Sequence, residues 1–192
     1  MDYTKISQIL KTCLDEERYE HSIGTAECAK ELAQVYGIDK EKAYLAGLLH
    51  DCAKCETNES LKEILLSKTE VFELTDCELI APKTFHAPAG AFVAKNKFGI
   101  EDEEILSAIR WHTIGKKGMT LLEKIIYLAD KIEAKTRPLD YREPIINLLN
   151  KENGLDKAIL ETYKCTIKSL TERNLPICFQ TIEVYNSLLE VL

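Results

Sequence analysis

The chain has 192 residues, of which 45% are hydrophobic and 30% are charged, a mixture typical of globular proteins. This composition excludes a disordered chain, a collagen-like repeat and a small disulfide-stabilised domain, and the length suits one large domain. The 25 basic and 32 acidic residues give a formal net charge of −7. That balance argues against nucleic acids and anionic membranes as partners, because both bind clustered positive charge.

The seven cysteines are scattered along the chain, and an odd number cannot all pair within it. The N-terminus lacks a signal peptide pattern, and no apolar stretch approaches the ~20 residues that cross a bilayer. We therefore expect a cytoplasmic protein, with no membrane partner, whose cysteines are reduced and have a packing role. Cys52 and Cys55 have the CxxC spacing of thiol and metal sites, but no second such pair follows. We favour a chance pair in a cysteine-rich chain over a functional thiol pair.

Helical periodicity dominates the sequence, and neither strand pairs nor internal repeats interrupt it. In chain order, apolar spacing and capping signals predict helices over about 3–17, 20–36, 40–54, 59–68, 87–98, 101–111, 121–133, 155–172 and 179–191. Asp39 is a typical N-cap, and Thr120 with Glu123 forms a capping box. Pro138 and Pro144 indicate a connection between helices. The sequence therefore predicts an all-α fold with a single domain over residues 1–192.

His50 and Asp51 follow a helical segment whose small residues allow a second helix to approach closely. On a continuous helix, Gly47, His50 and Lys54 share one face. A buried carboxylate needs a partner, and a divalent transition metal is a candidate because imidazole nitrogen and carboxylate oxygen both bind such ions. The simpler alternative is a helix-end pair satisfied by the backbone and by Lys54.

The other three histidines, His21, His86 and His112, also lie at or near the ends of expected helices. Each alone suits a capping or core role, but side chains at helix ends can converge on one cleft. Asp130 ends a mainly apolar helical run, where ion pairing to a neighbouring basic residue is the alternative to metal binding.

The order of His21, His50-Asp51 and Asp130 resembles the metal-binding signature of the HD-domain phosphohydrolase superfamily. The surrounding sequence is similar, over about residues 19–185, to the YqeK-type bacterial HD proteins, a family of symmetrical diadenosine tetraphosphate hydrolases. The matching stretches are Tyr19–Ser22, Leu48–Asp51, Phe85–Gly90, Ile109–Thr113 and Leu122–Glu133. Two positions depart from the family pattern. Phe-His-Ala-Pro stands at His86 in place of Leu-His-Gly-Pro, and Ala-Lys-Thr-Arg follows Glu133 in place of Pro-Gly-Arg.

The resemblance implies an HD-domain helical bundle with a metal-binding core over about 19–135 and C-terminal helices over about 145–192. It implies iron as the metal, with manganese and cobalt as alternatives. At least one ion is expected, and a second ion is an open alternative. The implied metal ligands are His21, His50, Asp51 and Asp130. The expected reaction is attack of metal-bound water on an inner phosphorus of diadenosine tetraphosphate, which yields two ADP molecules. The residues with expected catalytic roles are Asp51, Lys54, His86 and His112.

Contacts to a dinucleoside polyphosphate or to the ADP product are expected from ten side chains. These are His21, Asp51, Lys54, His86, His112, Lys116, Lys117, Tyr127, Lys131 and Arg137, with Arg110 as a further candidate. The Gly115–Gly118 loop can present backbone N–H groups to an anion. Three other functions are alternatives to this hydrolase. They are another HD-type phosphohydrolase or phosphodiesterase activity, a nucleotide-binding regulatory module with slow turnover, and a helical scaffold without catalysis. The sequence also leaves a homodimer open.

Overall fold

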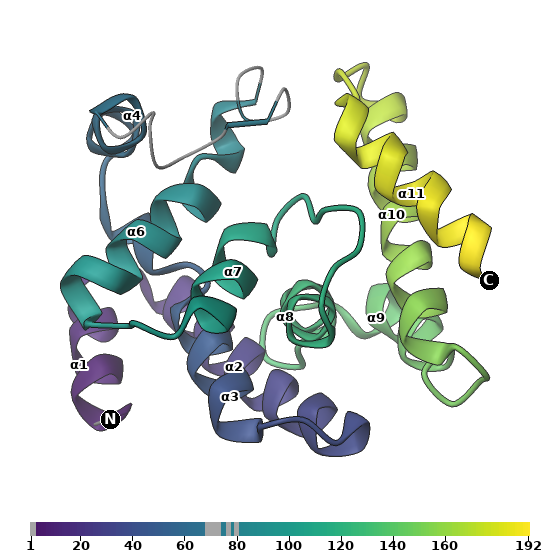
Figure 1. The fold of residues 1–192 in the computed structure, drawn as a ribbon, viewed down its shortest axis with the longest axis horizontal. Coiled ribbons are helices and arrows are strands. Elements are labelled where there is room, and N and C mark those ends of the chain that lie inside the picture. Colours follow the sequence, from purple (N-terminus) through teal and green to yellow (C-terminus); the bar gives the residue numbers. More distant parts are fainter. Residues whose placement is uncertain (1–2, 68–73, 76–77, 79–80) are drawn as a thin grey trace.

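A computed structural model describes residues 3–67, 74–75, 78 and 81–192, and over these residues it contains helices and no strand (Figure 1). The predicted all-α fold is therefore confirmed. In chain order the α-helices are α1 (Tyr3–Cys13), α2 (Glu16–Tyr36), α3 (Lys40–Leu49), α4 (Asn58–Ser67), α6 (His86–Phe98), α7 (Glu103–Trp111), α8 (Leu121–Ile132), α9 (Leu139–Ile146), α10 (Gly154–Glu172) and α11 (Phe179–Val191). Two short 3-10 helices, η1 (Cys52–Cys55) and η2 (Pro82–Thr84), follow α3 and precede α6.

Helices α2 and α3 approach each other closely because Gly47 on α3 has no side chain. A Cβ atom added at Gly47 would lie 2.8 Å from the Cα of Ala26 and 3.0 Å from the carbonyl oxygen of Thr25, both on α2. The close approach expected one turn before His50 is therefore confirmed. It sets the distance between the two helices that carry His21 and His50.

Helix α8 crosses the centre of the bundle and packs against α2, α3, α7 and α10 (Figure 1). It begins after Thr120, whose hydroxyl accepts the Glu123 N–H in the predicted capping box. Its apolar residues, including Ile125, Ile126 and Leu128, are fully buried. A helix buried on most of its surface can place a carboxylate at its end only where that carboxylate is paired.

The C-terminal helices cover one side of this core. Helix α10 packs on α8 and α9, and α11 lies against α10 as the second arm of a hairpin (Figure 1). The Tyr163 hydroxyl donates to the carbonyl oxygen of Ile114 at 2.7 Å, and Gln180 Nε2 donates to that of Gly115 at 2.7 Å. These two bonds attach the Gly115–Gly118 loop to the hairpin.

Two helix predictions were wrong. The helix expected over 40–54 ends at Leu49, and a turn at His50 and Asp51 separates it from η1. Helix α9 was expected to be a connection, because Pro144 lies inside it and Pro138 precedes it. The expected helix over 59–68 corresponds to α4, and its last residue, Lys68, lies outside the described residues.

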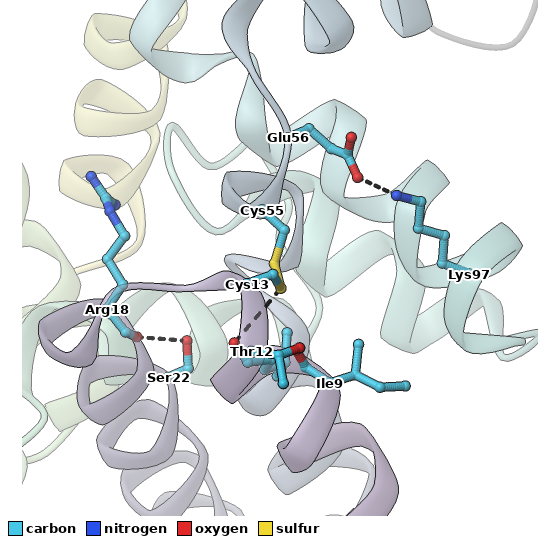
Figure 2. Close-up of a disulfide and its surroundings, with 9 residues drawn as sticks. Ile9, Thr12, Cys13, Arg18, Ser22, Cys55, Glu56 and Lys97 are labelled. Carbon is cyan, nitrogen blue, oxygen red and sulfur yellow. Dashed lines mark hydrogen bonds and ion pairs between the residues drawn. A yellow bond between two sulfur atoms is a disulfide. The ribbon is translucent and has the colours of Figure 1, made fainter.

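The cysteines were expected to be reduced, but disulfide-bonded cysteines occur in the described part of the chain, and Cys178 is one of them. Cys55 forms a disulfide with Cys13, and this bond joins the end of α1 to η1 (Figure 2). Cys52 is instead a buried free thiol that donates to the carbonyl oxygen of Gly90 at 3.5 Å. Cys52 and Cys55 therefore do not act as a thiol pair, which agrees with the expectation of a chance CxxC spacing. The disulfide between Cys13 and Cys55 was not expected. No helix in the described part of the chain is long and apolar enough to cross a membrane.

Candidate metal centre

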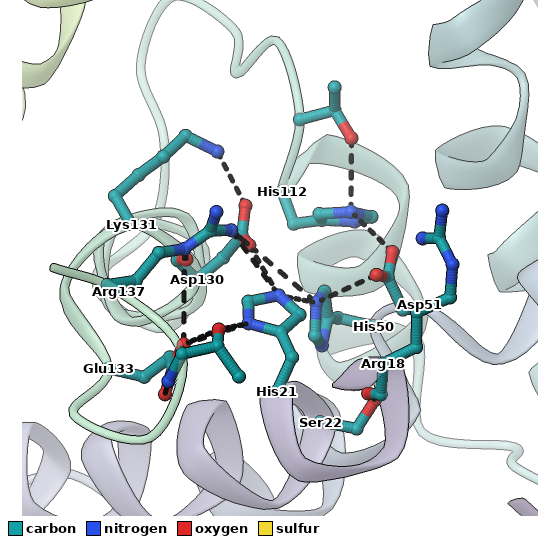
Figure 3. Close-up of polar contacts among 12 residues, drawn as sticks. Arg18, His21, Ser22, His50, Asp51, His112, Asp130, Lys131, Glu133 and Arg137 are labelled. Carbon is teal, nitrogen blue, oxygen red and sulfur yellow. Dashed lines mark hydrogen bonds and ion pairs between the residues drawn. The ribbon is translucent and has the colours of Figure 1, made fainter. Parts of the chain in front are cut away.

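The ends of five helices meet at one buried polar cluster. The cluster contains all four histidines and both aspartates singled out from the sequence, which are His21 on α2, His50 and Asp51 after α3, His86 at the start of α6, His112 after α7, and Asp130 near the end of α8. All of them are buried except His86, which is half-buried. Figure 3 shows Asp130 and Asp51 on opposite sides of the His50 ring.

The first group of candidate ligands consists of His21, His50 and Asp130. The Nε2 atoms of the two histidines are 3.2 Å apart, and Asp130 Oδ1 lies 2.9 Å from His21 Nε2 and 3.8 Å from His50 Nε2. All three candidate ligand atoms lie within 4.8 Å of one another. This spacing suits ligands that surround one cation.

The second group surrounds Asp51. Asp51 Oδ1 lies 3.4 Å from His86 Nε2 and 3.6 Å from His112 Nε2, and these two nitrogens are 3.2 Å apart. Asp51 Oδ2 lies 3.6 Å from His50 Nε2 and accepts a hydrogen bond from Lys54 Nζ at 2.7 Å. Asp51 therefore connects the two groups of ligands.

The hydrogen bonds of the rings fix the tautomers of three histidines. His50, His86 and His112 each direct Nδ1 at a backbone carbonyl oxygen three residues earlier, at 2.7, 2.8 and 2.7 Å respectively. A carbonyl oxygen only accepts, so each Nδ1 carries a proton. In the neutral ring, Nε2 then holds a free lone pair, and all three lone pairs point into the cluster.

The residues present fit a bound divalent transition metal. Asp51 Oδ1 is buried and has no hydrogen-bond partner among the described residues. The facing Nε2 atoms of His86 and His112 are both acceptors, and the single hydroxyl proton of Thr113 cannot serve both nitrogens, although it is 3.1 and 3.0 Å from them. A cation between such groups satisfies several acceptors at once. Mixed imidazole and carboxylate donors suit a divalent transition metal.

The electrostatics keep the His50 and His86 rings neutral and the Asp51 and Asp130 carboxylates ionised. Burial lowers the pKa of His50 to about 4 and that of His86 to about 3. Burial alone would raise the pKa values of Asp51 and Asp130, but His50 beside Asp51 and Lys131 beside Asp130 hold both well below their ordinary value. These are the protonation states that metal ligands require.

Asp130 is held by two basic side chains as well as by His21. Lys131 Nζ donates to Asp130 Oδ2 at 2.5 Å, and the Arg137 guanidinium donates to Asp130 Oδ1 at 2.9 Å and to its backbone oxygen at 2.9 Å. The ion pairing that was the alternative to metal binding is therefore present. It occurs together with the contact to His21, so the two interpretations are compatible.

A polar cleft of about 230 Å³ opens onto the cluster beside His21 and Asp51. Its lining includes three basic side chains, Arg18, Lys54 and Arg137, and three acidic ones, Asp15, Glu17 and Asp51. The three cations lie next to the candidate metal ligands and offer local partners to a polyphosphate chain despite the net charge of −7.

Four predicted substrate-contacting residues lie outside this cluster. Lys116 pairs with Glu123 at 2.8 Å, Lys117 is exposed, and the Arg110 guanidinium forms two hydrogen bonds with Glu78. Tyr127 is fully buried, with its ring stacked on Tyr163 at 5.2 Å between centroids. Roles for these four residues in binding stay predictions.

Four other residues at the site were not identified from the sequence: Arg18, Thr113, Glu133 and Thr136. Glu133 contacts His21 Nδ1 at 3.1 Å, and Thr136 lines the cleft. For two of these residues, the helical spacing from a candidate ligand could have indicated a place at the site. Arg18 lies one turn before His21 on α2, and Glu133 lies three residues after Asp130.

Comparison with known proteins gives consistent results. The family model described as the HD domain matches residues 18–135. The chain is 39% identical over 189 residues to a protein of Halalkalibacterium halodurans named symmetrical bis(5'-nucleosyl)-tetraphosphatase, with 98% of each chain covered. A Bacillus subtilis protein of the same name is 38% identical over 92% of both chains. One crystal structure, from Clostridium acetobutylicum, is described as a predicted HD superfamily hydrolase involved in NAD metabolism. Its sequence is 38% identical to this chain, and the two structures superimpose with a TM-score of 0.90 over 100% of this chain and 99% of the Clostridium chain.

Proposed function

Because this chain belongs to the HD domain family, we propose that it is a metal-dependent hydrolase that cleaves diadenosine tetraphosphate symmetrically into two ADP molecules. Relatives that are similar over nearly the whole chain are named for this activity. The single observation in the structure that carries the proposal is the convergence of four imidazole Nε2 atoms and two carboxylates beside a polar cleft that contains Arg18, Lys54 and Arg137.

The residues that would hold the metal are His21, His50, Asp51 and Asp130, with His86 and His112 available to a second ion. We propose iron as the metal, with manganese and cobalt as alternatives that the same nitrogen and oxygen donors accept. When bound, the metal would supply a Lewis acid that polarises a phosphate oxygen and lowers the pKa of water.

The basic residues of the cleft bind the phosphate chain in this proposal. Lys54 reaches the site through its hydrogen bond to Asp51, and Arg137 does so through Asp130. Arg18 lies at the N-terminal turn of α2, where backbone N–H groups also favour an anion. Together these groups orient the inner phosphates toward the histidines and balance their charge.

His86, His112 and Thr113 form the opposite wall of the site, and we assign them to stabilisation of charge on the phosphate. The leaving group in symmetric cleavage is the terminal phosphate of ADP, whose second pKa is about 6. Such a group departs without strong help from an acid. The regulatory-module alternative would predict loss of Asp51 or Asp130, and both are in place.

Product analysis tests the proposed function. The chelated protein is reloaded anaerobically with Fe²⁺, Mn²⁺ or Co²⁺ and given diadenosine tetraphosphate, and the nucleotides are separated by anion-exchange chromatography. We expect ADP as the sole product, two per substrate. ATP with AMP would contradict symmetric cleavage, and no turnover with any of the three metals would favour a binding module.

A charge-matched pair of variants tests the site. Asp51→Asn removes a carboxylate shared by both groups of ligands, so we expect metal retention and hydrolysis to fall together by at least about 100-fold. Asp156→Asn changes the net charge equally, but Asp156 pairs with Lys124 at 2.6 Å near the opposite end of α8. We expect it to keep both properties. Full activity in Asp51→Asn would refute the assignment.

A further inference from the structure

His21 is held differently from the other three histidines. It lies in the second turn of α2, and its Nδ1 donates to a side chain, Glu133 Oε1, at 3.1 Å, whereas the other three rings direct Nδ1 at backbone oxygens. Its Nε2 lies 2.9 Å from Asp130 Oδ1. Asp130 and Glu133 are one turn apart on α8, so a single helix end contacts both nitrogens of one imidazole (Figure 3).

Glu133 is fixed by its surroundings and is fully buried. Its Oε2 accepts the backbone N–H of Lys135 at 2.6 Å, the backbone N–H of Thr136 donates to Oε1 and Oε2 at 3.1 Å each, and the Thr136 hydroxyl donates to Oε1. Burial raises the pKa of Glu133, but the hydrogen bonds from His21 and Thr136 lower it to about 2. The carboxylate is therefore a fixed acceptor, with Oε2 bound to the Lys135 N–H and Oε1 facing the His21 Nδ1.

Space for this carboxylate depends on Gly24, one turn after His21 on α2. A Cβ atom built at Gly24 would lie 2.3 Å from Glu133 Oε2 and 3.1 Å from its Cδ. No side chain larger than hydrogen fits there while Glu133 keeps its position. Gly24 and Glu133 are thus complementary in shape, although 109 residues separate them in the sequence.

We propose that Glu133 is a positioning residue for the metal centre, which holds the Nδ1 proton of His21 so that Nε2 presents its lone pair to the metal, and that Gly24 is required to admit it. The inference rests on the proposed function, because it takes His21 as a metal ligand. Hydrogen bonding of the outer ring nitrogen to a carboxylate fixes the ring and increases its basicity as a ligand.

The chemistry of an amide makes the proposal testable. In Glu133→Gln, the backbone N–H of Lys135 requires the amide oxygen at the Oε2 position, where the Thr136 N–H can also donate to it, so the NH₂ group faces His21 Nδ1. Nδ1 must then accept, and the ring proton moves to Nε2, where it blocks the metal. The substitution preserves shape and packing but reverses the tautomer.

Cobalt binding is the first measurement. Chelated wild-type protein, Glu133→Gln and Asp156→Asn are titrated with Co²⁺, followed by calorimetry and by visible absorption. We expect Glu133→Gln to weaken Co²⁺ binding by about 10- to 100-fold and Asp156→Asn to leave it unchanged. Equal affinity of Glu133→Gln and wild type overturns the inference, as does equal weakening in Asp156→Asn. Failure of the wild type to bind any of the three metals would instead refute the proposed function.

Two further readouts separate positioning from a structural role. In metal-free protein at neutral pH, nitrogen NMR of labelled histidine should detect a proton on His21 Nδ1 in wild type, where Glu133 accepts it, and none on Nδ1 in Glu133→Gln. Gly24→Ala keeps the charge and should weaken Co²⁺ binding by at least tenfold, whereas Gly37→Ala, at the C-cap of the same helix, should not, because nothing lies within 4 Å of its Cβ and the strain of an alanine at φ 71° affects stability alone. This glycine pair decides the question even if Glu133→Gln does not fold, and unchanged affinity in Gly24→Ala overturns the inference.

Discussion

The spacing between α2 and α3 connects packing to the candidate metal centre, and Gly47→Ala changes it. The added Cβ would lie 2.8 Å from the Cα of Ala26, which is backbone and cannot rotate away. An ordinary contact needs at least 3.4 Å, so the two helices must separate locally by about 0.6 Å. The same movement displaces His21 on α2 from His50 after α3.

Two terms of opposite sign set the stability change. Overpacking of this kind costs about 3 kcal/mol when the contact is with backbone, whereas replacing glycine by alanine within a helix gains about 1 kcal/mol. The net loss is about 2 kcal/mol. With an unfolding entropy of about 0.4 kcal/mol/K for a chain of this length, Tm should fall by about 5 °C.

The effect on metal binding should be larger than this modest loss implies. Metal–ligand distances tolerate errors of only about 0.2 Å, and the His21 and His50 Nε2 atoms start 3.2 Å apart. We expect Co²⁺ affinity in Gly47→Ala to fall at least tenfold, measured by calorimetry beside Gly37→Ala as the control, whose Cβ would meet nothing within 4 Å. A folded Gly47→Ala protein with wild-type Co²⁺ affinity would refute the argument that helix spacing sets the ligand geometry.

Two other predictions concern stability. Cys13→Ser should lower the Tm of oxidised protein by about 10 °C, because closing a loop between residues 42 apart stabilises by about 4 kcal/mol; an unchanged Tm would show that the disulfide does not form. In metal-free protein, His50 and His86 are neutral when folded, with pKa values of about 4 and about 3, but titrate near 6.5 when unfolded. The unfolded chain therefore binds about two more protons near pH 5, so stability should fall by up to about 2.7 kcal/mol per unit as pH drops from 6 to 4. Urea titrations at each pH measure this slope, and a flat profile would contradict the burial of neutral rings.

Local signals were sufficient for most helices. Asp39 caps α3 as expected, and the Thr120–Glu123 capping box opens α8. Helix α9 was missed because it is only eight residues long, has one buried residue and contains Pro144, so neither periodicity nor composition indicated it. Its formation depends on packing against α8 and α10, which no local pattern records.

The candidate ligands were predictable because scarce residue types occur at helix ends, but their supporting contacts were not. Glu133 looked like one more acidic residue at the end of a helix. Its contact with His21 joins residues 112 apart in the sequence, and it depends on the angle at which α8 meets α2. The same holds for the bond between Cys13 and Cys55, since either cysteine alone fits a packing role.

The early end of α3 explains how two consecutive residues serve two groups of ligands. His50 keeps helical backbone angles, but Asp51 has φ −104° and ψ 13°, so the chain leaves the helix between them. On the continuous helix expected from the sequence, His50 and Lys54 would have shared one face, and Asp51 would have flanked it. With the turn, His50 lies beside His21 and Asp130, while Asp51 reaches His86, His112 and Lys54. Because α3 ends at these two consecutive residues, His50 can serve one group of ligands while Asp51 serves the other. Sequence periodicity did not reveal this helix end, although the arrangement of the site depends on it.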